Sequence, residues 1–452
     1  MTGIPSPRRA AAWVARRLPG RSGAVAAGRP ARRDPFERYA SLDSPTLLTV
    51  PTFRHDPDLD ATPSLCVLMP HLLLDRMTGG PNTILNVTAR LASRGVRLRY
   101  VATFDAADAD LDPLRRHIAA LVGADPSLPG VEFASAMDPG SPPTIGRNDV
   151  FMATWWPTAH VARAVLPLTR AGEFVYFIQD FEPGFYPWST NYALAAATYG
   201  FPARALFNES LLRSHFAAER VGRFANPAVL AQSMAIEPAV DREVFRPRPE
   251  SRPSDRPRPS RLRFYARPRN ERNCFDLGLK VLRVAAQSGV FDGEPWEFSF
   301  IGADLPAMAL SDRHEIRALP WLPYREYGAL LGESDLLLSL MLSPHTSYPP
   351  LEMAATGGTV VTNTFGVKTA EALARISPHI IAVEPEVESL VDAVRLAVER
   401  RRTGKPVAPA AADPAPLHAT WDDALVDALP WLIAAVDEIR AGGRDPVGGQ
   451  PA

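Results

Sequence analysis

Short apolar runs alternate with longer amphipathic segments along the first half of the chain. The segment 81–94 places apolar residues at 84, 87 and 91, which is the spacing of one helical face, and Pro81 suits the start of a helix. The apolar runs are typical of buried strands and lie at 65–69, 97–103, 131–133, 150–153, 174–178, 204–207 and 229–232. This alternation predicts a doubly wound α/β domain.

The same alternation resumes in the second half. Strands are predicted at 262–266, 297–301, 359–363 and 380–383 and in the continuous apolar run that follows Asp335, with a short strand or loop near 318–322. Helices are predicted at 274–288, 324–331 and 386–400, and a last helix at 421–439 is expected to kink at Pro430. The second half therefore predicts another α/β domain.

The length of 452 residues suggests two or three domains. A segment rich in Pro and Arg contains no apolar residue that could join a core, and it marks a boundary. The predicted organisation is a basic disordered tail at 1–60, a first domain at 61–245, a linker at 246–260, a second domain at 261–405, a helical segment at 406–441 that packs back toward the cleft, and a tail at 442–452.

The formal net charge is −1, from 49 Lys and Arg against 50 Asp and Glu, so we expect no nucleic-acid partner. Cys66 and Cys274 are the only cysteines, and both lie beside apolar residues, which favours buried free thiols in a reducing compartment over a disulfide. Apolar runs of the length that a membrane span needs are absent from the sequence. We therefore expect a cytoplasmic protein.

The first sixty residues are rich in Arg, Ala, Gly and Pro and contain no acidic residue before Asp34. Two interpretations stay open. The segment is either a disordered basic tail, or residues 8–18 form an amphipathic basic helix that contacts the anionic inner face of a membrane.

Gly79 and Gly80 separate the first strand from the helix that follows. A glycine pair at this place lets a charged ligand approach the backbone, and a tight turn without a ligand is the alternative. The third glycine of the dinucleotide fingerprint is missing, which disfavours an oxidoreductase.

The stretch 335–363 predicts strand, loop, helix and strand. A proline pair opens the helix and a glycine pair closes it, so Glu352 is expected in the first turn. There its carboxylate could hold two ribose hydroxyls while free backbone amides face a phosphate. The alternative is that Glu352 only favours its own helix start.

The loop 179–188 follows a predicted strand and carries Asp180 and Glu182 among four aromatic rings. Loops beyond the carboxyl ends of parallel strands are where ligands bind in open α/β sheets. Rings pack on the C–H faces of a sugar while carboxylates accept from its hydroxyls. A small aromatic core without a ligand is the alternative.

Three segments carry a resemblance to a known family. The Gly79-Gly80 loop with the helix 81–94 resembles the first βαβ unit of family 4 glycosyltransferases of the GT-B fold, and 351–361 resembles the second half of their Glu-x7-Glu region. Segment 266–272 resembles the site where an Arg and, five positions on, a Lys bind the donor diphosphate. Segments 177–186 and 265–268 narrow the resemblance to WsaF-type bacterial rhamnosyltransferases, which build surface glycans from dTDP-rhamnose.

The resemblance covers residues 64–245 and 261–400. It implies a GT-B fold, with two facing Rossmann-like domains around a cleft, and transfer of rhamnose from dTDP-L-rhamnose to a glycan or lipid-linked glycan with retention of configuration. We expect Asp180 or Glu182 to orient the acceptor hydroxyl. Donor contacts are predicted for Gly79, Gly80, Arg267, Arg272, Ser347, Tyr348 and Glu352.

Arg272 stands where the family has Lys and is still a cation, but a second departure from the family pattern matters more. The first Glu of the pair would fall at residue 344, which is Pro344, with His345 beside it. This departure fits a 6-deoxy sugar donor, and it also motivates the alternative of a GT-B-like protein that binds a nucleotide sugar or glycan without turnover. No cofactor or metal is expected, because two arginines can neutralise the diphosphate and the nine His residues are scattered.

Overall fold

The computed structural model describes residues 51–77, 79–104, 107–138, 140–237, 239–246, 258–404 and 417–443. The predictions for residues 1–50, for most of the linker and for residues 444–452 lie outside these ranges.

The first domain, residues 51–237, is built on a parallel sheet. Within the described residues this sheet has seven strands in the order β4-β3-β2-β6-β7-β8-β9. The strands are β2 (Leu65–Met69), β3 (Leu98–Ala102), β4 (Val131–Ser135), β6 (Val150–Ala153), β7 (Phe174–Ile178), β8 (Ala203–Asn208) and β9 (Met234–Ile236). The helices are α2 (Gly80–Ala92), α3 (Asp112–Val122), α4 (Trp156–Val165), α5 (Thr190–Thr198), α6 (Ser210–Ala218) and α7 (Pro227–Ala231). The strand order reverses between β2 and β6, so a topological switch point lies there.

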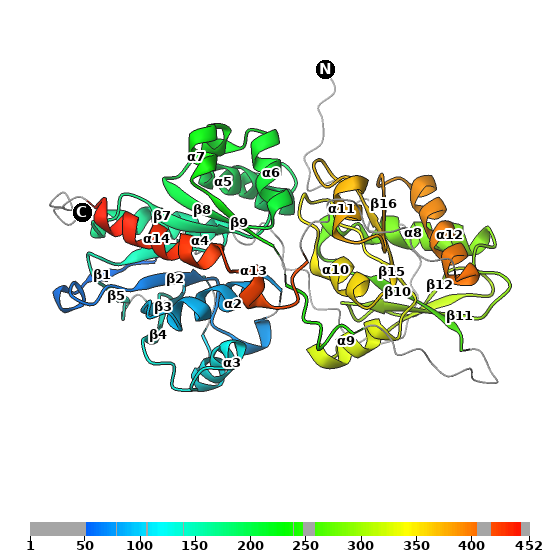
Figure 1. Cartoon of the computed structure of the whole chain (residues 1–452), viewed down its shortest axis with the longest axis horizontal. Helices are drawn as coiled ribbons and strands as arrows, with labels where there is room; N and C mark the ends of the chain where they lie inside the picture. The colour runs from blue at the N-terminus through cyan, green and yellow to red at the C-terminus, as the bar shows by residue number, and fades with distance from the viewer. Residues whose placement is uncertain are drawn as a thin grey trace, which may run out of the picture. The chain divides into compact units, whose positions relative to one another are not determined.

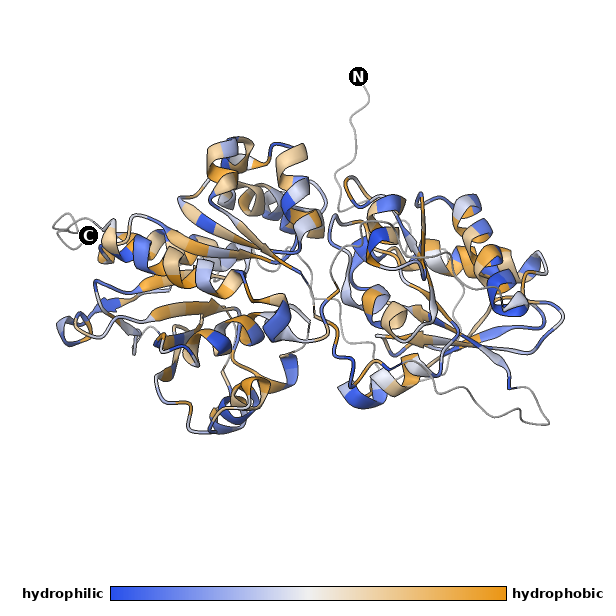
Figure 2. Cartoon of the chain, viewed as in Figure 1, coloured by the Kyte–Doolittle hydropathy of each residue, from blue (hydrophilic) through white to orange (hydrophobic). Residues whose placement is uncertain are grey.

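The central strands form because their residues are apolar without interruption. Every residue of β2, β6 and β7 is buried, and Figure 2 shows the strands of this sheet mostly in the hydrophobic colour. Continuous burial is expected for parallel strands that are covered on both faces. The predicted strand bounds are confirmed for these three strands.

The predicted tail at 1–60 extends too far. Residues 51–60 include strand β1 (Arg54–His55), which pairs in parallel with β5 (Thr144–Ile145). Phe53 is buried, and its ring meets the edge of Phe151 with centroids 5.9 Å apart. One buried aromatic residue anchors this segment to the domain.

The strand predicted at 229–232 is also wrong. Most of this segment belongs to the short helix α7, and the strand of this region is β9, which begins at Met234. The side chain of Asn226 accepts from the backbone N–H of Ala228, and Pro227 occupies the first helical position. This cap draws the apolar residues that follow into a helix.

The second domain, residues 258–404, contains the other large sheet of the described chain. Its seven strands run in the order β12-β13-β11-β10-β14-β15-β16, and β12 alone is antiparallel to its neighbour. The strands are β10 (Ser260–Tyr265), β11 (Trp296–Ile301), β12 (Met308–Ala309), β13 (Glu315–Ala318), β14 (Leu336–Leu338), β15 (Thr359–Asn363) and β16 (Ile380–Val383). The helices are α8 (Phe275–Gln287), α9 (Tyr324–Gly332), α10 (Tyr348–Ala355), α11 (Ala370–Ile376) and α12 (Val387–Thr403). The strand order reverses between β10 and β14, which gives this sheet its own switch point.

The predicted last helix is broken into α13 (Trp421–Ala424) and α14 (Ala428–Ala441). Pro430 does not kink a helix; it lies in the first turn of α14, where its missing N–H costs no intrahelical bond. In contrast to the expectation that this segment packs toward the cleft, α14 contacts β6, β7, β9 and α2 of the first domain (Figure 1). Its residues Leu429, Leu432 and Val436 belong to the core of that domain.

Both cysteines are free thiols, as predicted; Cys66 is buried as expected, whereas Cys274 is only half-buried. Of the helices in the described ranges, none has both the length and the apolar character that crossing a membrane requires.

Candidate functional site

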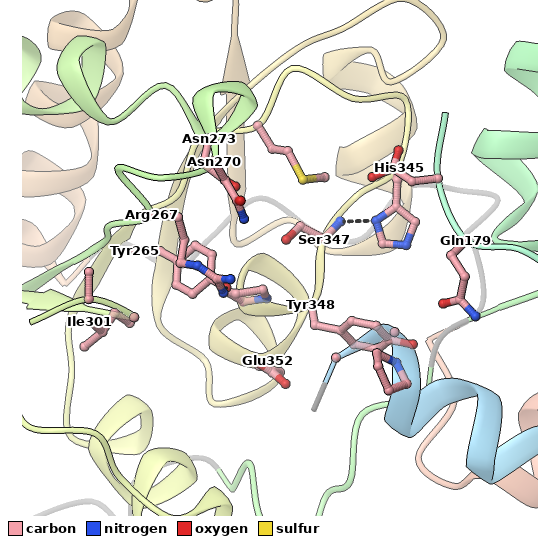
Figure 3. Close-up of a pocket in the computed structure, with 18 of the residues that line it drawn as sticks. Gln179, Tyr265, Arg267, Asn270, Asn273, Ile301, His345, Ser347, Tyr348 and Glu352 are labelled. Atoms are coloured by element: carbon pink, nitrogen blue, oxygen red, sulfur yellow. Dashed lines mark hydrogen bonds between the residues drawn. The ribbon is translucent and has the colours of Figure 1, made fainter. Parts of the chain in front are cut away.

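A pocket of about 880 Å³ opens where strands of both sheets end. Thr154 and Gln179 follow β6 and β7 of the first sheet, and Arg267 follows β10 of the second. Both switch points therefore contribute to one pocket, which is the place where ligands bind in open α/β sheets. The nine residues predicted from the sequence as site residues all line it, and Figure 3 shows several of them. They are Gly79, Gly80, Asp180, Glu182, Arg267, Arg272, Ser347, Tyr348 and Glu352.

The two arginines of the second domain differ in their surroundings. Arg267 is exposed, and its Nη1 donates to the hydroxyl of Tyr265 at 2.9 Å. Arg272 is half-buried, and its guanidinium lies over the ring of Phe185 at 4.3 Å from the centroid. Arg272 also forms an ion pair with Asp180. Two fixed positive charges thus line the pocket from the second domain.

Asp180 is a buried carboxylate at the centre of contacts between the domains. It accepts hydrogen bonds from Arg272 and from the hydroxyl of Ser343, both in the second domain. Burial by itself would raise the pKa of Asp180, but the charge of Arg272 and the bond from Ser343 hold that pKa below its ordinary value. Asp180 is therefore ionised at neutral pH.

Glu182 has a different environment. Its Oε2 accepts from the backbone N–H of Trp156 at 2.6 Å, at the start of α4, and from the hydroxyl of Tyr176 at 3.5 Å. Burial raises the pKa of Glu182 well above its usual range. The neighbouring ring of Phe181 packs on Tyr199. Glu182 is thus hydrogen-bonded to two groups of the first domain, and both interpretations of its role stay predictions.

Glu352 lines the pocket from α10 but not from its first turn. The helix begins at Tyr348, one residue before the proline pair, so Glu352 lies in the second turn. The helix starts early because Ser347 adopts a positive φ of 71° and turns the chain before Tyr348. Pro349 and Pro350 have no N–H, so the expected free amides at this helix start are largely missing.

The carboxylate of Glu352 is buried and accepts from the hydroxyl of Tyr327 at 3.1 Å. Burial raises the pKa of Glu352 to about 7. A carboxylate in this state is close to half ionised at neutral pH, and hydroxyl donors from a ligand would favour its charged form.

The glycine pair lies at the start of α2. Gly79 has a φ of 58°, a conformation that favours glycine. A Cβ on Gly80 would come within 3.2 Å of Gln179 Oε1, so a side chain at position 80 would crowd that amide.

Ser347 and Tyr348 join the loop before α10 to the rest of the pocket. The N–H of Ser347 donates to His345 Nδ1 at 2.9 Å, the contact marked in Figure 3. The hydroxyl of Tyr348 and that of Thr83, on α2, share a hydrogen bond of 2.9 Å. This bond links the first turn of α2, just after the glycine pair, to the start of α10.

Two buried ionisable residues near the pocket were not predicted. Glu209 follows β8 with a φ of 114° and accepts from the hydroxyl of Thr346 at 2.6 Å and from its N–H at 3.1 Å. Burial raises the pKa of Glu209 to about 8. Lys368 donates to the carbonyl of Met341 at 2.8 Å, and burial lowers the pKa of Lys368 to about 8. Both hold the loop that carries His345. The position of Glu209 just after a predicted strand was the signal that could have found it.

The described residues include no group of three or more His, Cys, Asp or Glu side chains that could hold a metal ion. The expectation of a metal-independent reaction stays a prediction.

Family models match most of both domains. The N-terminal domain of WsaF matches residues 64–210, and the C-terminal domain of WsaF matches residues 260–395. These matches confirm the resemblance seen in the sequence.

A curated relative and a solved structure add to this. O-antigen biosynthesis protein RfbC of Myxococcus xanthus is 41% identical over 215 residues, which are 48% of this chain but only 15% of that protein. The structure of Anabaena Alr3699/HepE in complex with UDP-glucose matches 83% of this chain and 98% of its own with a TM-score of 0.51 and 12% identity. The latter similarity concerns the fold, and the two parallel sheets agree with the predicted GT-B architecture.

Proposed function

Because the chain belongs to the WsaF family of GT-B glycosyltransferases, we propose that it transfers a sugar from a nucleotide diphosphate to a hydroxyl of a glycan acceptor. One observation carries this proposal. Arg267, Arg272 and Glu352 of the second domain line the same pocket as Asp180, a buried carboxylate of the first. Cations for a diphosphate and a carboxylate for a hydroxyl therefore share one cavity.

The proposed donor is dTDP-L-rhamnose, and the proposed product is a surface polysaccharide. The sequence similarity to an O-antigen biosynthesis protein supports a surface glycan as the product. Two features support rhamnose as the donor sugar. The first is membership of the WsaF family. The second is Pro344, which stands where the family pattern has a Glu whose carboxylate would hold a hydroxyl of the donor sugar. A 6-deoxy sugar has one hydroxyl fewer to hold.

The diphosphate is the leaving group of this reaction. Arg272 and Arg267 would neutralise the negative charge that grows on it, since guanidinium groups donate paired N–H bonds to phosphate and keep their charge. Glu352 would accept from the ribose hydroxyls. The glycine pair would let the diphosphate approach the start of α2.

Transfer would proceed with retention, by attack on the same face of the sugar. The bond from C1 to the phosphate oxygen breaks, a bond from C1 to the acceptor oxygen forms, and the acceptor proton passes to the departing phosphate. Asp180 would orient the acceptor hydroxyl by accepting from it. This route needs no covalent intermediate on the enzyme.

The loop that carries Pro344 contacts the carboxylate proposed to hold the acceptor. Ser343, the neighbour of Pro344, donates to Asp180 of the other domain. This contact favours turnover over the alternative of a protein that only binds nucleotide sugars or glycans.

A panel of nucleotide diphosphates and their sugars tests the donor. A ligand that binds only the folded protein raises its melting temperature. We expect the largest shifts with dTDP and dTDP-L-rhamnose, and release of dTDP from dTDP-L-rhamnose when the purified protein is added. Stabilisation by UDP or GDP compounds alone would contradict dTDP-L-rhamnose as the donor. Stabilisation by dTDP-L-rhamnose without release of dTDP would favour the binding protein, and no response to any nucleotide would contradict the proposal.

A further inference from the structure

The side-chain amide of Gln179 has no partner within the described residues. Both Nε2 and Oε1 are buried, and neither forms a hydrogen bond. Leaving such a group unsatisfied destabilises the protein, because the buried polar atoms have lost their hydrogen bonds to water. Gln179 lines the pocket directly after β7, so a ligand in the pocket is the natural partner for this amide.

The chemistry of an amide restricts what that ligand can be. Oε1 only accepts and Nε2 only donates, so a group that donates and accepts at neighbouring atoms satisfies both. A phosphate ester has only acceptors and would leave Oε1 without a partner. Two adjacent hydroxyls of a sugar fit, because each can donate and accept.

The amide lies away from Arg267, one of the two arginines predicted to hold the donor diphosphate. Figure 3 shows Gln179 on the side of the pocket that carries His345 and Tyr348, with Arg267 and Ile301 on the other side. Gln179 directly precedes Asp180, the carboxylate proposed to hold the acceptor hydroxyl. The rings of Trp155 and Phe185 line the same pocket and offer surfaces for the C–H faces of a sugar.

We propose that Gln179 binds the acceptor sugar, with Oε1 accepting from one hydroxyl and Nε2 donating to a neighbouring one. This proposal rests on the proposed function. Gln179 is thus a positioning residue that selects acceptors with adjacent free hydroxyls near the attacking one. The absence of a side chain at Gly80 keeps Oε1 from being crowded.

Saturation-transfer NMR with free monosaccharides tests the proposal without knowledge of the natural acceptor. The probes are L-rhamnose, D-galactose, D-glucose and D-mannose, each at millimolar concentration with dTDP present. Wild type is compared with Gln179→Ala and with the matched control Gln232→Ala. Gln232 is exposed in the first domain and lies outside the lining of the pocket. Binding of dTDP to each variant is measured separately and reports on folding.

We expect wild type and Gln232→Ala to bind at least one of the sugars, and Gln179→Ala to bind it about tenfold more weakly or not at all while dTDP binding is unchanged. Equal sugar binding by Gln179→Ala, or no sugar binding by wild type, would overturn the proposal. Displacement of the free sugar by dTDP-L-rhamnose would assign Gln179 to the donor sugar and overturn it as well. Failure of wild type to bind dTDP or dTDP-L-rhamnose would instead count against the proposed donor.

Discussion

Asp180 of the first domain forms an ion pair with Arg272 of the second, and the same carboxylate accepts from Ser343. The residue proposed to hold the acceptor hydroxyl is therefore bound to the residue proposed to hold the donor diphosphate. A diphosphate that reaches Arg272 must compete with Asp180 for its N–H donors. Donor binding would thus release a carboxylate for the acceptor.

Replacing Arg272 by Ala should remove one of the two charges that stabilise the leaving group. We expect transfer to fall by about 10²-fold or more, the usual effect of deleting a donor aimed at developing charge. Arg269→Ala is the matched control, because Arg269 is exposed on the same loop and lies outside the lining of the pocket. Kinetics and melting temperatures of both variants check this, and normal turnover per folded Arg272→Ala molecule would make the residue structural.

Replacing Asp180 by Asn keeps the shape of the side chain and removes its charge. Arg272 then loses its competing partner and the diphosphate loses a nearby negative charge, so nucleotide binding should tighten several-fold while transfer falls. Titration calorimetry with dTDP measures the first effect and a transfer assay the second. Weaker nucleotide binding together with a lower melting temperature would instead show that the pair mainly holds the domains together.

For Glu182, in contrast to Arg272 and Asp180, we expect a substitution to lower stability and not turnover. Its carboxylate accepts from the backbone N–H of Trp156 at 2.6 Å, and Glu182→Ala leaves that buried donor unsatisfied, at a cost of about 1–3 kcal/mol. We expect a lower melting temperature and unchanged turnover per folded molecule, with the exposed Glu219→Ala as control. A large loss of turnover at normal stability would support the catalytic role predicted from the sequence.

The fold could be predicted where apolar runs are continuous. Strands β2, β6 and β7 are buried at every residue. Their sequences are therefore continuous apolar runs, which are typical of parallel strands covered on both faces. The strand predicted at 229–232 was wrong because the N-cap at Asn226 starts a helix there despite the strand-like composition of the segment. Glu352 was predicted in the first turn of α10 but lies in the second, because the helix start depends on the positive φ of Ser347. Serine rarely adopts a positive φ, so the sequence does not predict this conformation.

Only part of the site could be predicted from the sequence. Asp180 follows a recognisable strand, and the rule that ligands bind beyond strand ends was enough to select its loop. Arg267 and Arg272 were predicted from the family resemblance of segment 266–272. Glu209 also lies just after a predicted strand and could have been selected by the same rule, but its contact with Thr346, 137 positions further along the chain, is not encoded by any local pattern. The orphaned amide of Gln179 is likewise visible only once its neighbours are placed.

Glu352 predicts a pH dependence of both stability and nucleotide affinity. Burial raises the pKa of Glu352 from 4.5 to about 7. Between pH 4.5 and pH 7 the folded protein therefore binds more protons than the unfolded chain. The contribution of Glu352 to the free energy of unfolding falls as the pH rises through this range. Ribose hydroxyls would favour the ionised carboxylate, so dTDP affinity should rise with pH up to about 7 and then level off. Glu352→Gln should flatten both dependences, whereas Glu326→Gln, at an exposed position on α9, should not. Denaturant unfolding and dTDP titrations on either side of pH 7 measure them, and wild-type pH dependence of dTDP affinity in Glu352→Gln would remove the residue from the ribose site.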